Sequence, residues 1–378
     1  MKLWGVSVSY FTGKLETYLR YKGIAYEMQH PFADQERIKK LAGAVQVPIV
    51  ERDDGRWMSD STPIIQQLET EYPARPVFPT DPAVRFIALL IEDYADEWLW
   101  RAAMHFRWSY EHDRELLSRI LADEVTSHLK LPRVVRRAIL RYRQRTWYVV
   151  KDGVNARTWD HVEAGYYAAM RNMLSMLETR PYLLGATPSI ADIGLMGPML
   201  RHFGQDPTPA AIMRNAWPAI AEWVARVWNA GQTAGDTALV AEIPADATPM
   251  LREIAETHLV QLAENARAFG RGAPRFEMTV QGCHYTDLPV SRYRVYCLER
   301  LREEFAALDP ASQETVKAHL PYPQASLIWD HALTANSGYD TDRTAPFNQS
   351  INVFEDDAVS KKLAWVQAAS SKGSRTAD

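Results

Sequence analysis

Hydroxyl and carboxyl side chains stand where two helices near the N-terminus are expected to begin. Ser9 and Tyr10 precede a helical pattern over residues 14–22, and Asp60 and Ser61 open another. A hydroxyl or carboxyl at such a place can cap the helix. The start of a helix also carries about half a positive charge and offers N–H groups to an anion. These four residues therefore predict either plain helix caps or a site for a charged ligand.

A second group combines carboxylates with aromatic residues. Glu92, Asp93, Asp96 and Glu97 recur at helical spacing, with His105 beyond them. Such spacing could hold a metal ion, but the Glu-x-x-His and His-x-x-x-His pairs typical of helical metal sites are missing there. We therefore expect no metal. The interleaved aromatic residues indicate one wall of a binding pocket or a dimer face. They are Tyr94, Trp98, Trp100, Phe106 and Trp108.

The cysteines indicate little chemistry of their own. Cys283 and His284, with Asp287 nearby, resemble a nucleophile and a base by composition only, because neighbouring residues on a strand point to opposite faces. The chain has only two cysteines, Cys283 and Cys297. Two thiols make neither a disulfide framework nor a thiolate metal site, and they fit a reducing compartment.

Length and charge limit the function classes. A chain of 378 residues predicts two or three domains, and 47% hydrophobic with 24% charged residues is ordinary for a folded protein. The net charge of −4 and the lack of a long basic run argue against a nucleic-acid partner. The arginine-rich stretch 133–145 is expected to be a solvated helix face. No apolar run is long enough to predict a membrane span or a secretory signal, so we expect a cytoplasmic protein without a membrane partner.

The elements that position the first group form a short mixed domain. Strands are predicted at residues 2–8, 24–28, 45–51 and 57–58, and helices at 14–22, 33–42 and 59–68. Gly23 ends the first helix, and Asp53-Asp54-Gly55 marks a hairpin turn. The first strand, helix and second strand make a βαβ unit with parallel strands. Pro48 within an apolar strand pattern indicates an edge or a bend. The order is βαβαββα.

The remainder is predicted to be helical. No convincing strand interrupts residues 81–231, and Ser189 with Asp192 has the spacing of a capping box. Residues 232–248 have the composition of a linker. Helices are expected at 249–269 and 289–308, a strand at 275–280, and an irregular tail after Tyr322. The predicted fold class is α+β: a thioredoxin-like domain at 1–78, an all-helical domain at 83–231, and a C-terminal extension at 232–378, mostly helical with an irregular tail.

In their order and spacing, these segments resemble the glutathione transferase family. The segments that carry the resemblance are Leu3-Trp4-Gly5, Ser9-Tyr10-Phe11 with Lys14, Lys22 to Glu27, Val47-Pro48-Ile49-Val50, Asp60-Ser61 before Ile64, and Ser189 to Asp192. The resemblance covers about residues 1–230. It implies a glutathione-binding N-terminal domain with a serine-type catalytic loop, and it leaves the extension unexplained.

The resemblance also implies a role for each residue of the site. Glutathione, as co-substrate, needs its backbone held and its thiolate stabilised. Val47, ahead of a cis Pro48, offers its backbone N–H and C=O to the cysteinyl unit, and Gln46 is a weaker candidate for the far carboxylate. Asp60 would pair with the γ-glutamyl amino group, and Ser61 with the γ-glutamyl carboxylate.

Two hydroxyls compete to activate the thiol. The Ser9 O–H could donate to the thiolate, and the helix start beside it would lower the thiol pKa further. Tyr10 is the rival donor, because Tyr-Phe-x-Gly also surrounds the hydroxyl of tyrosine-type members. The segment that follows is too short for that alignment, which favours Ser9 over Tyr10. No cysteine stands at this position, which argues against thiol–disulfide reductase chemistry.

The preferred function is conjugation or substitution of glutathione onto a small hydrophobic electrophile, seated between the first domain and the aromatic helices near residues 94–112. The resemblance implies a homodimer. A non-catalytic binding or scaffold protein stays open, because Tyr10, the long extension and Asp rather than Glu at position 60 depart from the family pattern. A glutathione-dependent lyase or dehalogenase, using the same thiolate, is the third reading.

Overall fold

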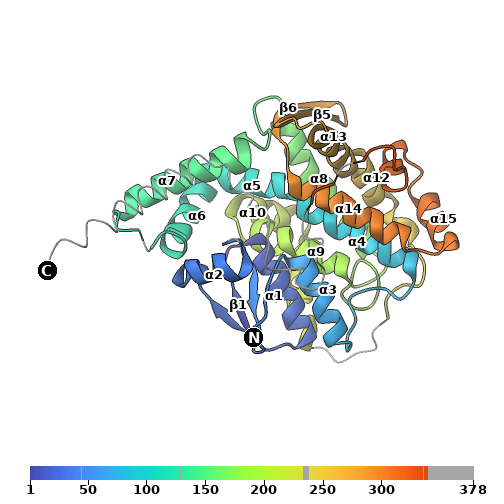
Figure 1. Cartoon of the computed structure of the whole chain (residues 1–378), viewed down its shortest axis with the longest axis horizontal. Helices are drawn as coiled ribbons and strands as arrows, with labels where there is room; N and C mark the ends of the chain where they lie inside the picture. The colour runs from blue at the N-terminus through green and yellow to red at the C-terminus, as the bar shows by residue number, and fades with distance from the viewer. Residues whose placement is uncertain (44, 128, 233–237, 335, 339–378) are drawn as a thin grey trace.

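A small mixed sheet packs against a large body of helices (Figure 1). The computed structural model describes residues 1–43, 45–127, 129–232, 238–334 and 336–338. The strands are β1 (Lys2–Trp4), β2 (Glu27–Gln29), β3 (Ile49–Glu51) and β4 (Trp57–Ser59). Their order is β2-β1-β3-β4, with β1 parallel to β2 and both other pairs antiparallel. The α+β fold class and the parallel first pair are therefore confirmed.

Helices cover both faces of this sheet. They are α1 (Tyr10–Lys22), α2 (Gln35–Ala42) and α3 (Ser61–Glu71), with the short 3₁₀ helix η1 (Pro31–Ala33) before α2. β1 is shorter than the predicted 2–8. The chain turns soon after Trp4, and the Ser9 N–H donates to the Val6 carbonyl at 3.0 Å. The turn takes Ser9 out of the sheet and places it at the start of α1.

Alternating side chains on the strands feed two cores, as the period of two in a strand requires. One side chain from each of β1, β3 and β4 joins the main core, and its neighbour joins a smaller core under α2. The main-core residues are Leu3, Val50 and Met58. The smaller core contains Trp4, Ile49, Trp57, Ile38 and Ala42.

The middle of the chain is helical, as predicted. Its elements are α4 (Pro82–Glu97), α5 (Leu99–Ser109), α6 (Glu111–Glu124), α7 (Arg133–Arg145), η2 (Thr146–Val150), α8 (Trp159–Leu177), α9 (Ile190–Pro198), η3 (Met199–Phe203), α10 (Pro207–Ala216), α11 (Pro218–Asn229) and η4 (Ala230–Gln232). In α7 only Leu140 is buried, which confirms the solvated arginine-rich helix. Among the described helices, none combines the length and apolarity needed to span a bilayer.

The predicted capping box is present at the start of α9, which is buried throughout between α1 and α4. Asp192 accepts hydrogen bonds from the Ser189 N–H and hydroxyl at 2.9 and 2.7 Å. It also accepts from the Leu183 N–H at 2.9 Å and the Trp223 indole N–H at 3.1 Å. One buried carboxylate therefore fixes the start of α9 and two neighbouring segments.

Asp192→Ala is expected to lower the free energy of unfolding by about 3 kcal/mol. The change removes the cap and leaves several buried donors without an acceptor. Urea denaturation would measure the loss. Asp246→Ala is the matched control, because Asp246 pairs with Arg180 nearer the surface and such pairs contribute less than about 1 kcal/mol. Equal losses in the two variants would contradict this prediction.

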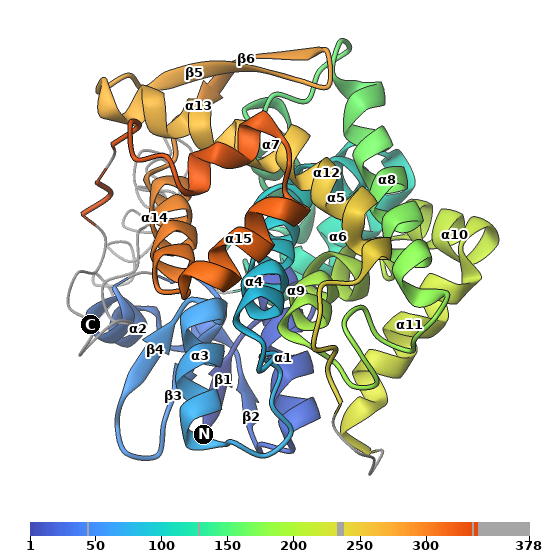
Figure 2. The same cartoon turned by 90° about the vertical axis from the view of Figure 1, so that its right-hand side faces the viewer.

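The C-terminal region contains more structure than predicted. Its elements are η5 (Ala245–Ala247), α12 (Thr248–Glu256), α13 (His258–Gly270), β5 (Arg275–Val280), β6 (Cys283–Pro289), α14 (Arg292–Ala306), α15 (Pro310–His319) and η6 (Pro323–Ile328). Figure 2 shows these helices stacked over α4. The tail expected after Tyr322 is described to residue 338; residues 339–378, and 233–237 of the predicted linker, lie outside the described residues.

Three local features account for the differences in this region. The helix predicted over 249–269 is broken at Thr257, which has φ −125° and ψ −73°. The unpredicted strand β6 pairs with β5 through Gln281 and Gly282, both at positive φ, a conformation that two-residue hairpin turns require. The unpredicted α15 begins with Asp309 as its cap and Pro310 in its first turn.

Candidate functional site

Strand register brings three of the predicted segments to one end of the sheet. Trp4 of β1 pairs with Ile49 of β3, and Ile49 pairs with Ser59 of β4. Three segments lie just beyond this row. They are the loop that leads from β1 to Ser9, the Val47–Pro48 bond that precedes β3, and Asp60, which follows β4. Residues far apart in sequence thus share one edge, where α1 and α3 begin.

Ser9 lies at this edge as the cap of α1. Its Oγ accepts a hydrogen bond from the Thr12 N–H at 3.3 Å, and the residue is partly exposed. Within the described part of the chain, the Ser9 hydroxyl donates to no protein group, so its proton is available to a ligand. The hydroxyl is therefore both a helix cap and a potential donor, the two roles that the sequence left open.

Arg107 of α5 fixes the loop before Ser9, a role that no motif in the sequence predicts. Its guanidinium donates to the Val8 carbonyl at 2.9 Å and to the Arg201 carbonyl at 2.6 Å. It also forms a bidentate pair with Asp206 at 2.7 and 2.9 Å. Burial raises the pKa of Asp206 to about 6, against the lowering effect of Arg107. The helical region thus holds the backbone of the Ser9 loop.

Tyr10 points away from this edge. It is buried, and its hydroxyl donates to the Ala95 carbonyl of α4 at 2.5 Å. Its ring lies against Gly197 of α9, where a Cβ would come within 2.7 Å of the ring. Burial, more than the nearby carboxylates, raises its pKa well above the usual value. These contacts favour Ser9 over Tyr10 as the group available to a thiol.

The Val47–Pro48 bond is cis, as the resemblance implied. Among the described residues, the backbone N–H and C=O of Val47 have no hydrogen-bond partner. They lie beyond Ile49, where the pairing of β3 with β1 and β4 ends, so they can bond the backbone of a short extended peptide. Gln46 is partly exposed beside them.

Asp60 and Ser61 begin α3, as predicted. Asp60 has a φ of 73°, which is uncommon for a residue with a side chain, and is partly exposed; Ser61 is buried. Such a backbone conformation costs on the order of 1–3 kcal/mol and is found preferentially at functional sites. Asp60 accepts a hydrogen bond from the Tyr293 hydroxyl of α14 at 2.8 Å. This partner from the C-terminal region was not predicted.

A buried ion cluster lies behind Asp60. Lys14 of α1 is fully buried and pairs with Glu92 and Asp96 of α4, the latter at 2.5 Å. Its ammonium also donates to the Thr62 hydroxyl of α3 at 2.8 Å. Two of the four carboxylates in the acidic run, Glu92 and Asp96, therefore pair with one buried lysine and connect α1 to α4.

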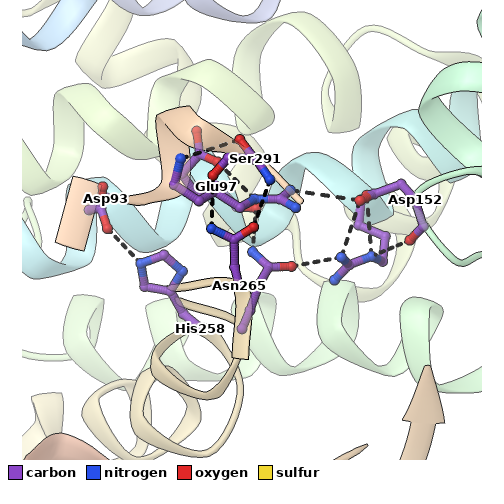
Figure 3. A network of polar contacts seen from close by, with 9 residues as sticks. Asp93, Glu97, Asp152, His258, Asn265 and Ser291 are labelled. Carbon is purple, nitrogen blue, oxygen red and sulfur yellow. Dashed lines mark hydrogen bonds and ion pairs between the residues drawn. The ribbon is translucent and has the colours of Figure 1, made fainter. Parts of the chain in front are cut away.

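The other half of the run faces the C-terminal region (Figure 3). Asp93 accepts a hydrogen bond from the His258 Nε2 at 2.6 Å, and Glu97 pairs with Arg294 at 3.1 Å. Residues one apart on a helix point to different sides, so the run serves two faces of α4. His105 instead lies 3.1 Å from Glu163. No group of three metal-binding side chains gathers in the described part of the chain.

The aromatic run does not form a pocket wall. Tyr94, Trp98, Phe106 and Trp108 are buried core residues, which corrects that interpretation. Phe106 and Trp108 lie on different sides of α5 and are both buried, because α5 is packed against several neighbours, among them α6, α8 and η2. Of the five, only Trp100 is partly exposed, and it stacks on Phe11 in the first turn of α1 with ring centroids 5.6 Å apart. Tyr148 packs edge-on against Trp100, so these three aromatic side chains form one cluster next to the Ser9 end of α1.

Cys283, His284 and Asp287 are not brought together. His284 lies 3.6 Å from Glu277, Asp287 pairs with Arg275, and Cys283 faces the Arg157 carbonyl. A cavity of about 410 Å³ lies between α13 and η6, and none of the predicted site residues lines it.

Comparison with known proteins concerns the first domain. Residues 3–76 match the model of the family described as "Glutathione S-transferase, N-terminal domain". No curated protein shows a significant match to the sequence.

Solved structures similar to this chain are distant from it in sequence. A glutathione S-transferase from Rhodospirillum rubrum F11 is 17% identical and covers 67% of this chain and 92% of its own, with a TM-score of 0.41. A beta-etherase from Sphingobium sp. strain SYK-6 is 19% identical and covers 60% of this chain and 93% of its own, with a TM-score of 0.42. A glutathione S-transferase from Methylobacterium radiotolerans JCM 2831, in complex with glutathione sulfonate, is 17% identical. It covers 64% of this chain and 99% of its own, with a TM-score of 0.38.

Proposed function

The chain belongs to the glutathione S-transferase family through its N-terminal domain, and we propose that it binds glutathione and transfers it to a small hydrophobic electrophile. The observation that carries this proposal is the row Trp4, Ile49 and Ser59. Because of this register, the Ser9 hydroxyl, the unpaired backbone of Val47 and the Asp60 carboxylate lie at one end of the sheet. These three groups match the thiol, the peptide backbone and the amino group of glutathione.

Each protein group has one task in the proposed reaction. The Val47 backbone holds the cysteinyl unit, Asp60 and Ser61 hold the γ-glutamyl end, and Gln46 lies toward the far carboxylate. Glutathione, when bound, supplies the thiolate nucleophile. The Ser9 hydroxyl donates a hydrogen bond that stabilises the thiolate, and the start of α1 adds its positive end. A carbon–sulfur bond forms while the leaving group departs with its electron pair. The electrophile lies beside Trp100 and Phe11.

Affinity for glutathione is expected to weaken as the pH falls through about 6. Burial raises the pKa of Asp60 to about 6, and only the ionised carboxylate attracts the ligand's ammonium group. Calorimetric titration with S-methylglutathione, which has no ionisable thiol, would isolate this dependence between pH 5.5 and 8. Asp60→Asn is expected to bind about 10-fold more weakly at pH 8 and to lose the dependence. A dependence unchanged in Asp60→Asn would assign it to another group, such as Asp206.

Retention on immobilised glutathione, followed by a conjugation assay with a generic aromatic electrophile, tests the proposed function. Retention with turnover supports a transferase. Tight retention without turnover, unchanged in Ser9→Ala, would support a binding or scaffold protein instead. Turnover that releases products other than a stable conjugate would indicate a lyase or dehalogenase.

We also propose a cytoplasmic homodimer, in line with the resemblance. Several large apolar side chains are exposed on α6, α7 and η2 and would suit a protein partner. They are Leu116, Val134, Val135, Tyr142 and Val150. Light scattering at micromolar concentration would test the dimer, and a single species of 43.0 kDa would contradict it.

A further inference from the structure

The feature that the family resemblance does not explain is the contact between the C-terminal region and Asp60. Tyr293 lies in the first turn of α14, and its hydroxyl donates to Asp60 Oδ2 at 2.8 Å. The two residues are 233 positions apart. A carboxylate has two oxygens and about four acceptor sites, so one bond from Tyr293 leaves acceptor capacity for a ligand.

A buried polar network fixes the start of α14 (Figure 3). Ser291 caps the helix through the Arg294 N–H, and Asn265 of α13 holds both backbone groups of Ser291 at 2.7 and 2.8 Å. Arg294 pairs with Glu97 of α4 at 3.1 Å and with Asp152 at 3.7 Å.

The network extends into α5. Arg101 of α5 donates to Asp152 and to Gln261 of α13, the latter at 2.7 Å. Tyr293 lies between Ser291 and Arg294, so these buried bonds fix its backbone. The place of Tyr293 beside Asp60 is therefore set by a buried network at the start of α14.

The groups around Asp60 come from four elements. Lys14 of α1 and the Thr62 N–H of α3 favour its ionised form, as does Tyr293; Glu92 of α4 opposes it. Cys297 of α14 is also nearby: burial raises the pKa of its thiol, and the charges of Asp93, Glu97 and Asp60 add to that effect. Tyr293 comes from the C-terminal region, and its hydroxyl donates a hydrogen bond directly to the Asp60 carboxylate.

We propose that α14 forms part of the glutathione site, with Tyr293 as a positioning residue that holds and orients the Asp60 carboxylate toward the γ-glutamyl ammonium group. This inference rests on the proposed function. It assigns the C-terminal region a direct role in recognising the amino end of the tripeptide.

Calorimetric titration of S-methylglutathione into the full chain and into Tyr293→Phe, from pH 5.5 to 8, tests the inference. Phenylalanine keeps the ring and removes only the hydroxyl. Loss of a hydrogen bond to a carboxylate is expected to move the midpoint of the pH dependence up by about one pH unit. The loss of affinity is then about threefold larger at pH 6.5 than at pH 8, where Asp60 stays ionised and only its orientation is lost. Tyr322→Phe, a hydroxyl deletion elsewhere in the C-terminal region, is expected to follow the wild-type curve.

The outcomes separate the two proposals. A midpoint raised in Tyr293→Phe alone supports the positioning role. The positioning role would be overturned by an unchanged midpoint, by an equal loss of affinity at every pH, or by a gain of affinity at every pH. In each of these cases, binding by the wild-type chain would still support glutathione recognition. A wild-type chain that binds no S-methylglutathione at any pH would overturn the proposed function and this inference together. Thermal melting of both variants verifies that each is folded.

Discussion

Lys14→Met is expected to lower the free energy of unfolding by about 3–5 kcal/mol. Lys14 is fully buried, and its ammonium pairs with Glu92 and Asp96 and donates to the Thr62 hydroxyl. Methionine fills most of the space of the lysine stem, so the loss comes from two carboxylates left without a cation rather than from a cavity. Urea denaturation at pH 7.5 would measure it.

The sign of the pH dependence distinguishes this mechanism from a packing defect. Burial already raises the pKa of Asp96 well above its usual value, against the lowering effect of Lys14. Without the ammonium group, the folded Lys14→Met protein binds more protons than the unfolded chain does near neutral pH. Its stability therefore rises as the pH falls. We expect part of the lost free energy to return between pH 7.5 and 5.5.

Two further variants control for the change of residue. Lys39→Met alters an exposed lysine of α2 and is expected to change stability by less than about 0.5 kcal/mol. Lys14→Met combined with Glu92→Gln and Asp96→Asn removes the charges as a set, and replacing a complete buried ion group is far less costly than breaking it. A triple variant no more stable than Lys14→Met alone would contradict the charge argument.

Local sequence patterns predict several features of the fold correctly. Such patterns depend on residues within one or two turns of each other. They predict the cap at Ser189 and Asp192, the arginine-rich solvated helix and the order of strands and helices. For the same reason, Asp60 and Ser61 were correctly placed at the start of a helix. The family resemblance added the cis bond before Pro48, which no local pattern predicts.

The contacts that assemble the site could not be predicted, because they join residues far apart in the chain. Arg107 reaches the Val8 carbonyl from α5, and Tyr293 reaches Asp60 from α14. Neither residue stands in a motif. The acidic run on α4 is plain in the sequence, but its division between two faces depends on which helices lie on each side. The aromatic run was misinterpreted for the same reason: burial on a helix is decided by its neighbours.

Ser9→Ala is expected to lower kcat/KM for conjugation about 10- to 100-fold at pH 7 if the proposed function holds. The Ser9 hydroxyl would donate to the thiolate, and a hydrogen bond to a charged group contributes about 1.5–3 kcal/mol. Without it the thiol pKa rises toward the free value of about 8.5. Activity of the variant should therefore recover as the pH is raised, which a pH–rate profile from 6 to 9 would detect.

The same hydroxyl caps α1, so stability must be separated from catalysis. Ser9→Ala removes the acceptor of the Thr12 N–H and is expected to cost about 1 kcal/mol of folding free energy. Ser9→Asp keeps a good cap but places a negative charge beside the thiolate. It is therefore expected to be stable and yet at least as inactive as Ser9→Ala. Tyr10→Phe should show the reverse pattern, because the Tyr10 hydroxyl donates to the Ala95 carbonyl inside the fold. An active Ser9→Asp protein would reduce Ser9 to a helix cap and return the choice of thiol activator to another group.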